Sequence, residues 1–197
     1  MDATLDLDAR DDPAADRSED WVAVQRTLAD PNAFALLYRK YVTDVYRYCY
    51  RRLQDRESAE DVTSQIFMHA FAALPDLGER PFRPWIFAIA RNGVIDRYRR
   101  QRPVETSLDA VRERPDDAIS PEDQIVDRDS VDTIHQLFQV LSERDRQIVE
   151  LRLAGLTGVE IAEAMQCSHA VVRTAQHRAF EKIRVMLADQ RPEGRPS

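Results

Sequence analysis

The sequence predicts an all-α protein made of two small helical domains joined by a flexible acidic linker. Its 197 residues contain only five glycines and scarcely any alternating β-branched run, which disfavours sheets. Apolar residues instead recur three or four positions apart in several segments, as on one face of a helix. Between two groups of these segments, the stretch 103–130 contains three prolines and nine acidic residues but little apolar pattern, which is typical of a linker.

The first helical domain is expected over residues 18–102. It follows an acidic tail, residues 1–17, which has too few apolar residues to fold. Ser18 is the expected N-cap of a first helix, and Asp30-Pro31-Asn32 ends it. A long helix with an aromatic and aliphatic stripe follows, from Ala33 to about Gln54.

Two further helices complete the first domain. Ser58 and Asp61 match a capping box, so we expect one helix to begin at Ser58. A loop over residues 75–83 contains two prolines. Pro84 then suits the first turn of a last helix that ends near Arg102.

The second helical domain is expected over residues 131–188, before a disordered tail, 189–197. Within it, Thr157 and Glu160 match a capping box at the start of a short helix. A tight turn and a longer helix follow, so residues 157–185 have the order of a helix-turn-helix, whose second helix lies in the major groove of DNA.

Charge is unevenly distributed along the chain. The formal net charge is −7. Residues 1–20 hold eight acids and two arginines, the linker holds nine acids and three arginines, and residues 21–102 carry a net +5. Five arginines, at positions 91, 97, 99, 100 and 102, lie within twelve residues at the end of the first domain. Such a concentration favours an anionic partner.

Several classes of protein are disfavoured. No apolar run approaches the roughly 20 residues that span a bilayer, and the N-terminus does not resemble a signal peptide. Two cysteines are too few for a disulfide framework, so we expect a cytoplasmic protein without membrane insertion. The four histidines have no metal-ligand spacing, and no glycine-rich phosphate loop is present. We therefore expect neither an enzyme nor a cofactor or metal site.

The outward face of the second helix-turn-helix helix is polar and suits DNA. Arginine and glutamine pair with purine edges, and hydroxyl groups bind phosphates. The outward residues that we expect to contact DNA are Ser168, His169, Arg173, Thr174, Gln176, His177 and Arg178. A three-helix bundle with a merely polar surface is the alternative for this segment alone.

Three motifs in order resemble the extracytoplasmic-function (ECF) sigma factors of the sigma-70 family: "SAEDVTSQIFMHAF", "PFRPWIFAIARNGVIDRYRRQR" and "LSERDRQIVELRLAGLTGVEIAEAM". The resemblance covers roughly residues 21–187. It implies that the first domain is sigma region 2, the second is region 4, and the protein initiates bacterial transcription by −10 and −35 recognition and −10 melting.

The resemblance also implies where region 2 meets the promoter. In the family, the loop before its last helix captures an unstacked base of the −10 element, and arginines on the helix follow the DNA backbone. Carried onto this chain, the −10 contacts are Arg80, Phe82, Arg83, Arg91, Asn92, Arg97, Arg99 and Arg100. Helical spacing with Ile89 favours a core position for Trp85 rather than a stacking role.

The implied protein partners are core RNA polymerase, through the β′ clamp coiled coil and the β flap, and an anti-sigma factor. The polymerase-binding residues carried over are Asp61, Ser64, Gln65 and Met68. Acidic residues here also suit the N-terminal dipole of a helix, so Asp61 has a structural alternative. Relatives often have Gln-Glu at positions 64–65 and Gly in the helix-turn-helix turn, where this chain has Gln166-Cys167.

Two other functions fit parts of the pattern. A helix-turn-helix repressor would bind duplex DNA alone, whereas a sigma factor needs core polymerase. A pure protein-interaction module is the third alternative.

Overall fold

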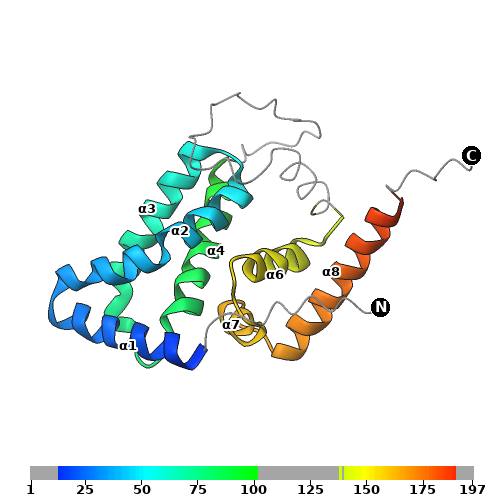
Figure 1. The fold of residues 1–197 in the computed structure, drawn as a ribbon. Coiled ribbons are helices and arrows are strands. Elements are labelled where there is room, and N and C mark those ends of the chain that lie inside the picture. Colours follow the sequence, from blue (N-terminus) through cyan, green and yellow to red (C-terminus); the bar gives the residue numbers. More distant parts are fainter. Residues whose placement is uncertain (1–12, 102–137, 139, 190–197) are drawn as a thin grey trace, which may run out of the picture.

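The computed structural model describes residues 13–101, 138 and 140–189, and the regular elements of these residues are all helical (Figure 1). The predicted all-α class is thereby confirmed for this part of the chain. The expected linker, 103–130, and residues 190–197 of the expected tail, 189–197, lie outside the described residues, whereas Asp189 ends the last helix. The elements in order are α1 (Pro13–Ala29), η1 (Pro31–Ala33), α2 (Phe34–Leu53), α3 (Arg56–Ala73), η2 (Leu74–Asp76), α4 (Phe82–Gln101), α6 (Glu143–Leu153), α7 (Gly158–Ala164) and α8 (His169–Asp189).

The first domain is a bundle in which α2, α3 and α4 lie side by side and α1 crosses near one end (Figure 1). Apolar residues three or four apart turn inward from each helix. Leu37 and Val45 of α2, Ile66 of α3, and Ile86 and Val94 of α4 are each no more than 2% exposed. The helical periodicity in the sequence therefore corresponds to a real core.

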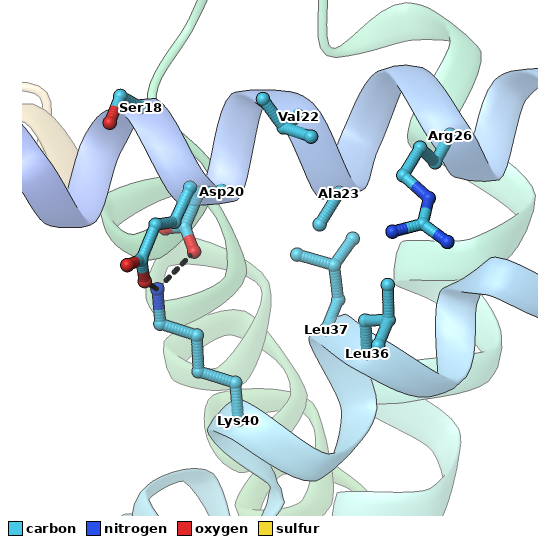
Figure 2. A pocket seen from close by; sticks show the side chains of 9 residues that line it. Ser18, Asp20, Val22, Ala23, Arg26, Leu36, Leu37 and Lys40 are labelled. Carbon is cyan, nitrogen blue, oxygen red and sulfur yellow. Dashed lines mark hydrogen bonds and ion pairs between the residues drawn. The ribbon is translucent and has the colours of Figure 1, made fainter.

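A buried carboxylate anchors α1 on α2. Asp20 is only 4% exposed. It accepts a hydrogen bond of 2.5 Å from Tyr41 Oη and one of 2.7 Å from Lys40 Nζ. Figure 2 shows the Lys40 pair beside a hollow between the two helices, lined by Ser18, Glu19, Asp20, Val22, Ala23, Arg26, Leu36, Leu37 and Lys40.

The first helix begins earlier than expected. It starts at Pro13 rather than after Ser18, so residues 13–17 of the expected acidic tail, 1–17, are helical, and residues 1–12 lie outside the described residues. Proline suits the first helical turn because its missing N–H would have no partner there. The alanines that follow favour the helix as well.

The third helix begins at Arg56, two residues before the position predicted. Gln54 ends α2 with a left-handed backbone, φ 54°. Asp55 is then the N-cap, and its carboxylate accepts a 2.9 Å hydrogen bond from the Ser58 backbone N–H. Ser58 is therefore not the cap. The capping rule was right, but the acidic residue three positions earlier takes that role.

The second domain has the predicted helix-turn-helix. Thr157 and Glu160 form the predicted capping box: Glu160 accepts from the Thr157 N–H at 2.8 Å, and Thr157 Oγ1 accepts from the Glu160 N–H at 3.3 Å. The turn after α7 contains Gln166 with φ 51°. Helix α8 then lies across α6 and α7 (Figure 1).

The two domains touch. Helix α4 packs against α7, and the end of α2 lies against α6 (Figure 1). Buried apolar residues form one continuous cluster from Val24 of α1 to Ala175 of α8. Among the described residues, no helix is long and apolar enough to cross a membrane.

Candidate nucleic-acid and polymerase interfaces

The predicted arginine row on α4 divides into two sets. Arg99 and Arg100 are exposed, as is Asn92. Arg91 and Arg97 are half-buried and already have protein partners. In this arrangement DNA can reach the exposed set, whereas the half-buried set is occupied by the protein itself. Helical periodicity did not show this difference.

Both half-buried arginines donate hydrogen bonds within the protein. Arg97 Nη2 donates to Ser58 Oγ at 2.8 Å. Arg91 Nε donates to Oε1 of Gln147, in the second domain, at 2.8 Å. Arg97 therefore supports the α3–α4 contact, and Arg91 joins the two domains.

The loop before α4 differs from the prediction at Phe82. Helix α4 starts at Phe82, earlier than Pro84, and turns this ring into the core with 1% exposure. The ring packs on Tyr41 and Trp85 at centroid distances of 5.4 and 5.7 Å. The burial of this ring contradicts, in this arrangement, the prediction that Phe82 contacts the −10 element. Spacing explains the burial, because Phe82 and Ile86 lie one turn apart on the inward face.

The two arginines of this loop are also engaged. Arg80 donates to the carbonyls of Leu77 and Asp76 at 2.9 and 2.6 Å, closing the turn after η2. Arg83 Nη2 donates to the Gly155 carbonyl of the second domain at 3.1 Å. Trp85 is half-buried against the core, as predicted.

The four residues expected to bind polymerase share one face of α3. Asp61, Ser64, Gln65 and Met68 are all exposed, and Met68 is 64% exposed. They are three or four residues apart, so they project from the same side of the helix. Ser64 Oγ donates to the Glu60 carbonyl at 2.9 Å, so its hydroxyl is partly satisfied within the helix.

An aromatic ridge beside this face was missed from the sequence. Phe71 and Tyr38 are each 43% exposed. Phe71 meets the ring of Phe34 edge-on at 5.1 Å, and Tyr38 meets Phe67 at 4.8 Å. Periodicity assigned these rings to the core, because a helical stripe does not show how far a neighbouring helix covers it. For Phe71 a signal was available, because it follows the exposed Met68 by three residues and so lies on the same side of α3.

The polar face of α8 is arranged as predicted. Val172, Ala175 and Ala179 are fully buried and hold the helix against α6 and α7. The opposite side carries the expected DNA contacts, of which Gln176 is half-buried and Ser168, His169, Arg173, Thr174, His177 and Arg178 are exposed.

Two side chains of this face are constrained by the rest of the domain. Arg178 Nη2 forms a 3.0 Å ion pair with Asp145 of α6, which is only 5% exposed on its side chain. His169 lies against the start of α7, where a Cβ on Gly158 would come within 2.6 Å of its Nε2 atom. Among the described residues, no ion pair is found for Arg173.

Groups suited to other chemistry are scarce in the described part of the chain. Cys49 is buried, and this burial raises the pKa of its thiol to about 12. The thiol is therefore protonated near neutral pH, and only thiolates act as nucleophiles. No cluster of three potential metal ligands is found among the described residues.

Comparison with known proteins agrees with this geometry. The family model for sigma-70 region 2 matches residues 37–104, and that for sigma-70 region 4 matches residues 132–183. The chain belongs to the sigma-70 family. Its first domain is thus sigma region 2 and its second is sigma region 4, as the three motifs implied.

Individual relatives place it among the ECF sigma factors. SigW of Bacillus subtilis is 30% identical over 172 residues, covering 81% of this chain and 91% of SigW. ShbA of Streptomyces griseus is 36% identical over 157 residues, covering 73% and 81%. Both are ECF RNA polymerase sigma factors. The chain is accordingly a transcription initiation factor with the two regions that recognise promoters.

A solved structure shares the fold. CnrH, in complex with the cytosolic domain of CnrY, aligns with 87% of this chain and 98% of its own, with a TM-score of 0.68 and 21% identity.

Proposed function

We propose that this ECF sigma factor binds core polymerase and promoter DNA through three separate surfaces. The exposed face of α3 binds the β′ clamp of core RNA polymerase, the end of α4 contacts the −10 element, and α8 contacts the −35 element. The observation that carries this proposal is the arrangement of α8, whose buried residues leave six of the seven promoter-binding candidates exposed and Gln176 half-buried.

The −10 contacts in this proposal are Asn92, Arg99 and Arg100, which are exposed, together with Arg80, Arg83 and Arg91. The last two become available only when region 4 moves away from them. Phosphate contacts from arginines supply most of the affinity for nucleic acid and make it salt-dependent. The protein acts by binding and positioning rather than by catalysis, and in the cytoplasm, where bacterial RNA polymerase is found.

Reconstitution with core polymerase tests the assignment. We expect the wild-type chain to co-elute with core and to support transcripts from specific promoters. The triple variant Asp61→Lys, Gln65→Glu, Met68→Glu should keep its helicity but lose core binding. Thr43→Glu is a control for the added charge, because Thr43 is exposed and lies on α2 rather than α3. If the chain bound duplex DNA by itself and did not co-elute with core polymerase, a repressor would be supported instead.

A regulatory partner is part of the same proposal. CnrH has been solved with the cytosolic domain of CnrY, and we expect an anti-sigma factor to bind this chain as well. Affinity capture from the native cell in the presence of competing core polymerase tests this. A partner displaced by core supports it, and capture of core alone contradicts it.

A further inference from the structure

Asp145 of α6 makes a different contact from the one that its position predicts. Ser142 is the N-cap of α6, and its Oγ accepts a 3.2 Å hydrogen bond from the Asp145 backbone N–H. In a capping box, the side chain at this third helical position bonds back to the N-cap backbone, as Glu160 does at the start of α7. The Asp145 carboxylate instead turns toward α8, where its Oδ1 accepts a 3.0 Å hydrogen bond from Arg178 Nη2.

The helix dipole does not explain this arrangement. The dipole favours an acidic side chain near a helix N-terminus without requiring burial, and Glu143 in the same turn is exposed. Asp145 is buried, and burying a carboxylate costs free energy unless the group is paired and hydrogen-bonded. The ion pair with Arg178 offsets that cost, so the contact between these two side chains is what keeps the carboxylate in place.

The packing of α6 against α8 places this carboxylate beneath the polar face of α8. Ala179, the neighbour of Arg178, is fully buried and clusters with Leu141 and Val149. The Arg178 side chain is 56% exposed, whereas its partner is almost covered. A guanidinium has five N–H donors, and within the described part of the chain one of them is used, by Asp145. The outer edge of the guanidinium is therefore left for a ligand in solvent.

A held arginine differs from a free one in what it loses on binding. A free arginine loses rotamer freedom when it contacts DNA, which weakens binding by about 2- to 10-fold for one side chain. Arg178 has lost part of that freedom beforehand, because its guanidinium is tied to a buried group. Arg173 lies on the same helix, and no ion pair is found for it in the described ranges. The two exposed arginines are thus ordered to different extents before DNA binds.

We propose that Asp145 is a positioning residue for −35 recognition, which holds the Arg178 guanidinium so that its outer edge contacts a single DNA phosphate. A planar guanidinium can bind a phosphate through two N–H groups, and phosphate contacts fix the register of a protein on the duplex. Asp145 is buried and acts only through Arg178. This inference rests on the proposed −35 role of α8, and it adds the side chain that orients one of the contacts.

Neutral phosphate analogues test this orientation in the holoenzyme. Promoter fragments carry one methylphosphonate each along the −35 element, and the affinity of the holoenzyme for each fragment is measured. With the wild-type chain, neutralising the phosphate that Arg178 contacts should weaken binding by about tenfold. With Asp145→Asn, which keeps the side-chain shape, the effect should spread to neighbouring phosphates, and the contrast between them should fall by about 2- to 10-fold. An unchanged pattern overturns the proposal, even if overall affinity or stability falls.

Two further variants locate the cause. Arg178→Ala should abolish the effect at its phosphate, and adding Asp145→Asn should change nothing more, because Asp145 acts through Arg178. A further change of the pattern in the double variant overturns the positioning role. Glu181→Gln is the matched control, since it removes a charge from α8 at a residue that pairs locally with Arg184 at 2.8 Å. Its pattern should be that of the wild type, and a spread pattern would attribute the Asp145→Asn result to lost charge alone.

A measurement on the wild-type chain covers the case in which Asp145→Asn does not fold. Nitrogen relaxation of the arginine Nε–H groups reports motion on the picosecond-to-nanosecond timescale. In the free full-length chain the Nε–H of Arg178 should be more ordered than that of Arg173, and equal order overturns the proposal.

Failure of the proposed function gives a different result. If Arg178→Ala leaves the phosphate pattern of the wild type unchanged, Arg178 does not contact the −35 element, and the proposed contact fails together with this inference. If Arg178→Ala removes an effect that Asp145→Asn does not alter, the −35 contact stands and only the inference is overturned.

Discussion

Arg173 and Arg178 of α8 should have different effects on promoter recognition. Both are exposed, and Arg178 forms an ion pair with Asp145, whereas none is found for Arg173 in the described part of the chain. They are five residues apart, so they point about 140° away from each other on a helix. The buried neighbours Val172 and Ala175 fix the orientation of Arg173. We expect Arg173 to contact base edges and Arg178 to contact a phosphate.

The expected magnitudes follow from these roles. Arg173→Ala removes a base contact of about 1–3 kcal/mol, or roughly 5- to 150-fold in affinity, at one or two −35 positions. Arg178→Ala should weaken all −35 sequences about equally and reduce the salt-dependence slope by about 0.9. Removing Arg178 also leaves the buried Asp145 carboxylate unpaired. Because Arg178 is half exposed, that loss costs at most about 1 kcal/mol of stability.

Promoter libraries randomised over the −35 element, transcribed with each mutant holoenzyme, separate the two outcomes. Arg178→Ala/Asp145→Asn is the control that removes the ion pair without leaving a buried charge. It should match Arg178→Ala in sequence preference but be more stable. If Arg173→Ala lost activity uniformly while Arg178→Ala changed the preferred sequence, the two roles would be reversed.

Three further changes test other parts of the structure. Met68→Glu alone should weaken core polymerase binding at least several-fold by placing a charge in an apolar contact, measured by fluorescence anisotropy of labelled sigma. Gln166→Gly should stabilise region 4, because relief of a left-handed backbone strain of about 1–2 kcal/mol exceeds the roughly 0.5–1 kcal/mol that the extra chain entropy of glycine costs on folding. Urea unfolding followed by circular dichroism should show a higher midpoint, and a lower one would refute the strain. Gly158→Ala should displace the His169 ring and weaken −35 binding, because the new Cβ would lie 2.6 Å from its Nε2 atom. In a His169→Ala background the same change should have no effect, and a persistent loss would place the cause in α7 itself.

The helices that carry the candidate site followed from residue type and spacing, whereas the polymerase-binding and −10 residues were assigned by resemblance to the sigma factors. The α3 face, the exposed arginines at the end of α4 and the polar face of α8 lie on the predicted helices and point to solvent. Local rules were enough because capping and periodicity depend on neighbours within one or two turns. The ends of the helices were predicted less accurately, because local capping rules can be satisfied at more than one nearby residue. The Asp55 cap and the start at Pro13 each lie within five residues of the predicted position, because several nearby residues suit a helix start.

The sequence alone determined the helical class, the helix-turn-helix and the family, because each depends on local patterns and on motif order. Only the tertiary structure decided which side chains are free. Phe82 is core rather than loop because α2 and α4 cover its ring. Arg83 and Arg91 bond to region 4, and Arg52 is buried against Glu150, through contacts between residues 56 to 98 positions apart. No local pattern encodes such pairings, since burial and ion-pair partners are set by how whole helices meet.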